Sequence, residues 1–287
     1  MAVFSTSMIK DLRDRTGLGM MECKRALTAS DGDIDKAIDD LRKSSGIKAA
    51  KKAGRIAADG IIAVKISEDN KYGVMIEVNT ETDFAARDDS FVSFVNESLN
   101  SAYDTDKFVF EEFIVNMEDA RQALVQKIGE NISIRRVEIL SSSIVGSYVH
   151  SNKRIGVMVA LEKGHAEVAK DVAMHVAASN PQVVKPEDMP DHLVQKEKEI
   201  FIAQAKESGK SDEIINKMIN GRINKFLSES SLINQPFVKN PEITVNELVK
   251  DSDAEILSFY RFEVGEGIEK NEVDFATEVA AQVNAAK

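Results

Sequence analysis

Five carboxylate side chains stand close together in the segment EVNTETDFAARDDSF, residues 77–91. They are Glu77, Glu81, Asp83, Asp88 and Asp89. Carboxylate oxygens at such short spacing can bind a hard cation such as Mg²⁺ or act as a general acid and base pair. No second group of reactive residues accompanies them, so a metal-dependent hydrolase is a weakly supported alternative.

The same segment has a structural and a binding explanation. In the structural one, Thr82 or Asp83 shapes a turn and Phe84 lies in the core, while Asp88 and Asp89 favour the start of a helix. In the binding one, Asp83 and Phe84 form a protruding loop tip, where an aromatic side chain beside a carboxylate enters a partner's pocket. Composition alone favours the structural explanation.

Common enzyme motifs are missing from the sequence. It contains no G-x-x-x-x-G-K-[ST] loop, no G-x-G-x-x-G turn after a strand and no G-x-S-x-G elbow. The four histidines have no metal-ligand spacing; they are His150, His165, His175 and His192. We therefore expect no catalytic residue, no metal site and no cofactor.

The composition of the 287 residues, with 43% hydrophobic and 30% charged, is typical of a globular protein. The only cysteine, Cys23, cannot form an intrachain disulfide, which indicates a reducing compartment. Residues 1–10 lack a signal-peptide pattern, and no apolar run approaches the length of a membrane span. We expect a cytoplasmic protein without a membrane partner.

Charge is unevenly distributed along the chain. The net charge is -11, which disfavours direct nucleic-acid binding. Residues 10–55 nevertheless carry 12 bases and 8 acids. Within them, residues 42–55 contain six basic residues, no acidic one and two glycines, which argue against a continuous helix. We interpret this run as a tether, and binding of RNA or the ribosome is the alternative.

Apolar spacing predicts three short helices within residues 5–45. Ser5 or Ser7 is the expected first cap, Gly17 and Gly19 turn the chain, and Asp33 opens the third helix. A bundle of about 40 residues has a small core, so we expect a docking module rather than a catalytic domain.

The next region has the pattern of a sheet with helices. Residues 60–67 and 72–80 predict a β-hairpin, and Phe91 begins the apolar face of a helix. A further helix over about 117–129 leads into a strand at 132–140, whose alternation of apolar residues is imperfect.

The same order of elements recurs. Residues 145–162 again predict two strands, 165–179 a helix and 256–267 a closing strand, which suggests a duplicated α+β unit. Residues 187–228 interrupt the second copy with two amphipathic helices joined at 208–210. Their apolar surface could be covered by self-association, by a partner or by folding back on the body.

Segments along nearly the whole chain resemble, in order, those of the bacterial elongation factor Ts family. They are LRDRTGLGMMECKRAL (12–27), DGDIDKAIDDLRKSSG (31–46), EVNTETDFAARDD (77–89), KIGENISIRRVE (127–138), GSYVH (146–150), MHVAASNP (174–181), GRINKF (221–226), QPFVKNP (235–241) and RFEVGEGIEK (261–270).

The resemblance implies a guanine nucleotide exchange factor for the GTPase elongation factor Tu, and no enzyme. It also implies an α+β fold with an N-terminal ubiquitin-associated-like three-helix bundle, two related α+β core subdomains, an inserted antiparallel coiled-coil hairpin and a C-terminal helical module. The expected divisions are 1–55 for the bundle and basic linker, 56–140 for the first core subdomain, 141–186 with 229–265 for the second, 187–228 for the hairpin and 266–287 for the C-terminal module.

The resemblance also implies which residues bind the partner. The loop Thr82, Asp83, Phe84 and Ala85 would press on the GTPase near its magnesium site. The N-terminal module would grip the nucleotide domain through Leu12, Arg13, Thr16, Gly17, Gly19, Met20 and Met21. The chain departs from the family where Ala85 replaces the usual valine and where Thr80 replaces Cys, Ser or Val.

The implied mechanism follows from linkage. A factor that binds the nucleotide-free GTPase more tightly than the GDP-bound form weakens GDP binding by the same free energy. Phe84 would wedge between helices of the partner while Asp83 perturbs its Mg²⁺ coordination. The expected partner is elongation factor Tu, both GDP-bound and nucleotide-free, and the hairpin could join two copies of the chain. A binding protein for RNA or the ribosome, using the bundle and the basic run, is the alternative.

Overall fold

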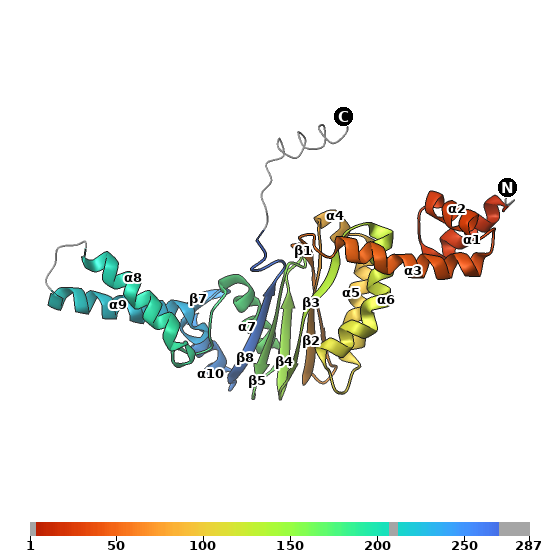
Figure 1. The fold of residues 1–287 in the computed structure, drawn as a ribbon. Coiled ribbons are helices and arrows are strands. Elements are labelled where there is room, and N and C mark those ends of the chain that lie inside the picture. The colour runs from red at the N-terminus through yellow and green to blue at the C-terminus, as the bar shows by residue number, and fades with distance from the viewer. Residues whose placement is uncertain (1–3, 207–211, 270–287) are drawn as a thin grey trace.

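The computed structural model describes residues 4–206 and 212–269. A small helical bundle lies at the N-terminal end, two sheets form the centre, and a pair of long helices projects from the opposite side (Figure 1). No helix in the described ranges is long and apolar enough to cross a bilayer.

The N-terminal bundle contains the three predicted helices, α1 (Thr6–Thr16), α2 (Met20–Ala29) and α3 (Ile34–Lys52), although α3 extends beyond the expected residue 45. Ser5 caps α1, and Gly17 ends it in the left-handed conformation with φ 66°. Asp33 caps α3 by accepting a hydrogen bond from the backbone N–H of Lys36. The core of the bundle consists of Leu12, Leu18, Cys23, Leu27 and Ala37.

The prediction of a tether over residues 42–55 is wrong, because α3 continues to Lys52. Ser45 and Ala49 are buried on its inner face, and α3 packs against α6 (Phe110–Ile128). A Cβ added to Gly46 would lie 3.0 Å from the side chain of Gln122 on α6. Gly46 therefore lies inside the helix, facing α6, and does not break it.

Two three-stranded antiparallel sheets form the centre of the molecule. The first has the order β1 (Asp59–Ile66), β2 (Tyr72–Thr80), β3 (Ile132–Ser141), and the second has the order β4 (Ile144–Val149), β5 (Ile155–Leu161), β8 (Ile256–Glu263). The predicted hairpins and closing strands are therefore confirmed, although β8 ends at Glu263 rather than residue 267.

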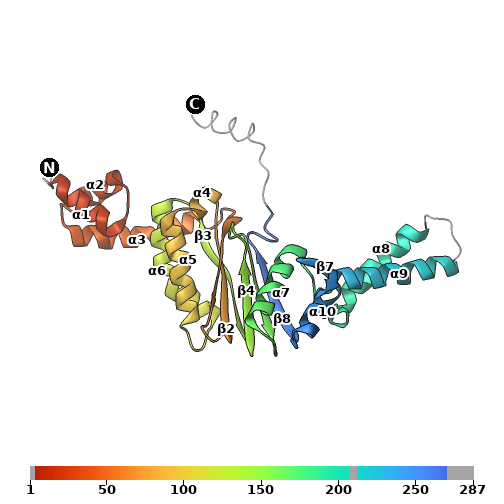
Figure 2. The same ribbon diagram turned by 180° about the vertical axis from the view of Figure 1, so that it is seen from behind.

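The sheets pack against each other through one face and carry helices on the other (Figure 2). Their shared core consists of Ile62, Met75, Leu140, Val145, Met158, Ala160, Phe262 and Val264. Helices α5 (Asp89–Tyr103) and α6 cover the first sheet, and α7 (Ala166–Ser179) covers the second. Because the middle strands β2 and β5 are covered on both faces, nearly all of their residues are buried.

Some elements differ from the prediction. Helix α6 begins at Phe110, earlier than the expected residue 117, because Phe113 and Met117 both bury their side chains in the first core. A small unit after the helical pair was not predicted: η2 (Leu232–Asn234), β6 (Pro236–Phe237), β7 (Asn240–Thr244) and α10 (Val245–Asp251). The short η1 (Pro186–Asp188) was also missed.

The two predicted amphipathic helices are α8 (Asp191–Lys206) and α9 (Asp212–Ser230). They lie side by side in both views (Figures 1 and 2). The predicted turn at 208–210 and most of the predicted C-terminal module, residues 270–287, lie outside the described residues.

Candidate functional site

The candidate site is the short helix α4 (Asp83–Ala86), which follows directly after β2. Thr82 is its N-cap, and the side chain of Phe84 is 80% exposed. Ala85 and Ala86 are buried beneath it. The structural explanation, which placed Phe84 in the core, is wrong for this residue. The structure instead has the exposed aromatic tip of the binding explanation.

Glu130, in the turn just before β3, holds the beginning of this loop. Its Oε2 accepts hydrogen bonds of 2.9 Å from the backbone N–H of Thr82 and from the Thr80 hydroxyl. Its Oε1 accepts the Thr82 hydroxyl at 2.7 Å. The hydroxyl oxygen of Thr82 also accepts the N–H of Ala85 at 3.2 Å. One carboxylate thus holds both the last residue of β2 and the N-cap residue of α4.

The charges next to Phe84 are paired within the loop. Arg87 donates to Oδ2 of Asp83, four residues earlier in the chain, at 2.7 Å. The side chain of Arg87 is exposed, and that of Asp83 is about half exposed. Asp88 caps α5 through the N–H of Ser90 at 2.8 Å. Burial raises the pKa of Asp88, but the hydrogen bond from Ser90 outweighs it and the pKa lies below its usual value. The predicted capping role of Asp88 is confirmed.

The five carboxylates of the first hypothesis do not converge. Glu81 accepts the backbone N–H of Asn131 at 2.6 Å and pairs with Arg55, away from the Asp83–Arg87 pair. Among residues 4–206 and 212–269, no three His, Cys, Asp or Glu side chains are grouped so that they could hold a metal ion. This arrangement gives no support to the metal-dependent hydrolase.

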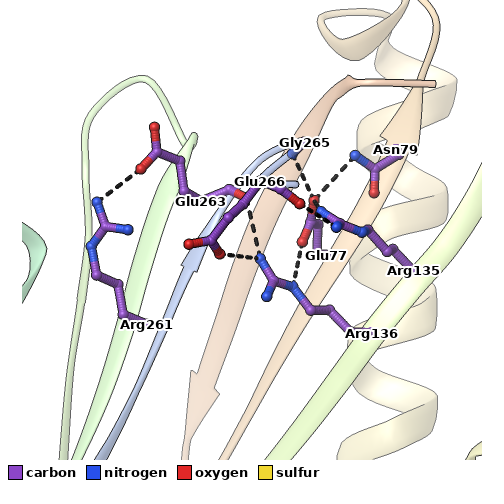
Figure 3. A network of polar contacts seen from close by, with 8 residues as sticks. All are labelled: Glu77, Asn79, Arg135, Arg136, Arg261, Glu263, Gly265 and Glu266. Atoms are coloured by element: carbon purple, nitrogen blue, oxygen red, sulfur yellow. Dashed lines mark hydrogen bonds and ion pairs between the residues drawn. The ribbon is translucent and has the colours of Figure 1, made fainter. Parts of the chain in front are cut away.

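Glu77, on the covered strand β2, is fully buried, and a network of hydrogen-bond donors offsets the cost of burying its charge (Figure 3). A β-bulge places Glu77 opposite Arg136 and Val78 opposite Ile134, which leaves Arg135 as the extra residue. Both arginines therefore reach the same carboxylate, Arg135 at 3.1 Å and Arg136 at 2.5 Å.

Two further groups complete this network. Asn79 donates to Oε1 of Glu77 at 3.1 Å and the N–H of Gly265 does so at 2.9 Å. Burial raises the pKa of Glu77, but the Gly265 hydrogen bond and the two arginines hold it below its usual value. Sequence reasoning missed this network, although the imperfect alternation of the strand at 132–140 was a signal of the bulge.

A groove of about 520 Å³ lies beside α4. Ile61, Ala86 and Val92 form part of its lining, and Arg87 and Arg154 lie at the same groove. Arg154 is held by Asp59. Asp83 also lines the groove, so apolar side chains, two arginines and a carboxylate meet there, next in sequence to the exposed Phe84.

The N-terminal candidate residues divide into two groups. Leu12 is buried in the bundle, Thr16 donates its hydroxyl to the carbonyl of Leu12 at 2.7 Å, and Gly17 ends α1. These three residues maintain the module. Arg13, Gly19, Met20 and Met21 are exposed, Met21 to 67%. The bundle that carries them lies at the N-terminal end of the molecule, apart from α4 (Figure 1).

The basic run is engaged within the chain. Lys48 pairs with Glu22, Lys52 donates to the carbonyl of Gly129, and Arg55 pairs with Glu81. The first contact lies within the bundle, between α3 and α2, and the other two join the end of α3 and the segment after it to the central core. They leave fewer cations available for RNA, so the structure gives the RNA-binding alternative no positive support.

Comparison with known proteins gives a consistent result over the whole chain. The model of the family "Elongation factor TS" matches residues 81–266. Elongation factor Ts of Hahella chejuensis is 59% identical over 284 residues, covering 99% of both chains. The same protein of Saccharophagus degradans is 60% identical over 286 residues, again with 99% of both chains covered. The chain belongs to the elongation factor Ts family.

More distant members of the family match to a similar extent. Elongation factor Ts of Pseudomonas aeruginosa is 56% identical over 289 residues, and the match covers all of both chains. The family consists of non-catalytic nucleotide exchange factors for elongation factor Tu, and this chain is one of them. The expected family, and the expectation of an exchange factor rather than an enzyme, are confirmed.

Proposed function

We propose that this exchange factor releases GDP from elongation factor Tu by pressing the loop Thr82, Asp83, Phe84 and Ala85 against the partner's magnesium and phosphate site. The observation that carries the proposal is the 80% exposure of Phe84 on a short helix whose first turn is hydrogen-bonded in place. Burying the Phe84 side chain in a pocket of the partner would contribute about 1.5–3 kcal/mol to the free energy of binding.

Asp83 gives the loop its charge. Its carboxylate is about half exposed and paired with Arg87, so it is presented beside Phe84 in a fixed orientation. In the complex, this charge acts on the coordination of the partner's Mg²⁺. Weakening that coordination removes the main counter-charge of the GDP phosphates.

The direction of the effect follows from thermodynamic linkage. The loop has room in the partner only when the nucleotide site is open, so the factor binds the nucleotide-free GTPase more tightly. GDP binding must then weaken by the same free energy. No covalent bond is formed or broken, and the factor works in the bacterial cytoplasm.

The rest of the chain is proposed to position and anchor this loop. The exposed Arg13, Gly19, Met20 and Met21 support the N-terminal bundle as a second contact with the partner. The C-terminal module, 266–287, is assigned the same role by family resemblance.

The core divides, in this proposal, into two related α+β subdomains, 56–140 and 141–186 with 229–265. Matching strand orders, β1-β2-β3 and β4-β5-β8, and a helical layer on each outer face support the division. The coiled-coil hairpin, 187–228, is an insertion in the second. Self-association through its exposed Ile200 and Ile214 stays a prediction, which the molar mass in solution would test.

The test is the release rate of fluorescent GDP from elongation factor Tu, with the wild type, Phe84→Ala and Asp83→Ala. Both variants should accelerate release less than the wild type while still forming the complex. Val115→Ala is the matched control, because Val115 is also a strongly exposed apolar residue but lies on α6. If the control and Phe84→Ala lose the same acceleration of GDP release, the loop has no specific role in exchange.

A further inference from the structure

Three donors at the end of β2 and at the start of the exchange loop, Thr82 to Ala85, converge on one carboxylate. The Thr80 hydroxyl, the Thr82 hydroxyl and the Thr82 backbone N–H all donate to Glu130, at 2.7–2.9 Å. Glu130 lies 48 residues beyond Thr82 in sequence, so the contact joins the end of β2 to the turn before β3. A charged acceptor with three donors is stronger than three separate neutral hydrogen bonds.

The convergence determines how α4 begins. The Thr82 hydroxyl has one hydrogen, and it is donated to Glu130. Its lone pair then faces the N–H of Ala85 and caps the helix. A helix of four residues has too few internal hydrogen bonds to be stable alone, so the capping contact sets the direction of Phe84.

Adjacent contacts hold Glu130 itself in place. The next residue, Asn131, donates its backbone N–H to Glu81 and its side chain to the carbonyl of Arg55 at 2.8 Å. Arg55 in turn pairs with Glu81. The turn before β3 is therefore attached both to the loop and to the segment that follows α3.

We infer that Glu130 is a positioning residue of the exchange reaction, which orients α4 through Thr82 so that Phe84 is presented to the partner GTPase. The inference rests on the proposed function of the loop. Glu130 is partly buried, and both of its oxygens are occupied by donors of its own chain. It therefore acts through Thr82 rather than by touching the nucleotide site.

The variant Glu130→Gln tests this inference, because it keeps the size of the side chain and replaces one acceptor oxygen by an NH₂ donor. A donor then faces either the N–H or the hydroxyl of Thr82. The maximal rate of GDP release at saturating factor should fall about tenfold, the equivalent of one hydrogen bond to a charged group. The factor concentration for half-maximal acceleration should change less than about twofold, because the other contacts with the partner are intact.

A double-mutant cycle separates positioning from general destabilisation. In the Phe84→Ala background, Glu130→Gln should change the maximal rate less than about twofold, because the side chain that Glu130 positions is already missing. Glu247→Gln is the matched control. Glu247 likewise accepts the backbone N–H and the hydroxyl of a threonine, Thr244, at the start of α10. This control should exchange GDP at the wild-type rate.

A threonine pair gives an independent test that leaves Glu130 in place. Thr82→Val removes the hydroxyl with little change in shape and should slow exchange as Glu130→Gln does. Thr82→Ser keeps the hydroxyl and should restore the rate. If Glu130→Gln unfolds below the assay temperature, these two threonine variants still show whether the contact between Thr82 and Glu130 is needed for exchange.

Three results would overturn the inference, and they can be distinguished from one another. If Phe84→Ala slows exchange but Glu130→Gln and Thr82→Val do not, or if Glu130→Gln slows it equally with and without Phe84, then Glu130 has no positioning role. If Phe84→Ala itself leaves the rate unchanged, the proposed function of the loop is wrong and the inference fails with it.

Discussion

Gly265, just after the last strand, donates its backbone N–H to Oε1 of Glu77 on β2 at 2.9 Å. This hydrogen bond joins the two sheets, because β8 and β2 belong to different ones. Gly265 has φ 76°, a left-handed conformation that glycine adopts without strain. Arg136 reinforces the junction by also contacting the side chain of Glu266 at 3.2 Å.

Glu77→Ala should destabilise the protein by about 3–5 kcal/mol, because it leaves two arginines and a buried N–H without their acceptor. Denaturant unfolding followed by circular dichroism measures this. Glu266→Ala is the matched control, since Glu266 pairs with Arg136 but is about half exposed and should cost less than about 1 kcal/mol. Similar losses in both variants would contradict the account of the buried network.

Stability should fall at acidic pH partly through Glu77. Its pKa lies below the usual 4.5 in the folded protein, so its contribution is present above that value and is lost as the pH falls through the folded-state pKa. The free energy of unfolding, measured between pH 6 and pH 3, should therefore fall less steeply in Glu77→Gln than in the wild type. Parallel pH profiles would refute this assignment.

His175 should give a second pH dependence in a different range. The buried ring contacts Oε1 of Gln235 at 2.9 Å, and its Nδ1 accepts the N–H of Val238 at 3.1 Å, which requires the neutral form. Burial lowers its pKa below the usual 6.5.

Because protonation is favoured in the unfolded chain, the contribution of His175 is present above pH 6.5 and decreases as the pH falls toward the folded-state pKa. In His175→Gln, the free energy of unfolding should change less between pH 7.5 and pH 5.5 than in the wild type. An unchanged slope in the variant would exclude this role.

The N-terminal candidates should separate into a stability residue and a binding residue. Leu12→Ala should destabilise the bundle by about 2–5 kcal/mol, because Leu12 is fully buried. Met21→Ala should leave stability unchanged but weaken binding to elongation factor Tu, since Met21 is 67% exposed. Thermal unfolding and titration calorimetry distinguish the two, and unchanged affinity in Met21→Ala would remove Met21 from the interface.

Local sequence patterns predicted the elements well where one periodicity dominates. The hairpin strands and helix α7 follow directly from apolar spacing. Gly46 misled the prediction, because a glycine inside a helix reads as a break unless the neighbouring helix is known. The unit formed by β6, β7 and α10 was missed because its strands are too short to show alternation.

The sequence identifies the candidate loop itself, but it does not identify the residues whose contacts hold the loop and the sheets in place. Asp83 and Phe84 were identified, because they carry the family motif. Glu130 lies far from them in sequence, and the sequence offers Glu77 only as one of five carboxylates in the weakly supported metal-site alternative. Both roles depend on pairing between β2 and β3, and on a bulge whose register no local pattern specifies.

The most direct test of the central claim is stopped-flow release of fluorescent GDP from elongation factor Tu, at saturating concentrations of the wild type and of Phe84→Ala. The account predicts that the variant still binds the GTPase but that its maximal rate of GDP release is at least about tenfold lower than that of the wild type. The reason is the loss of one buried aromatic contact of about 1.5–3 kcal/mol. Equal maximal rates for the two proteins would contradict the claim that this loop drives exchange.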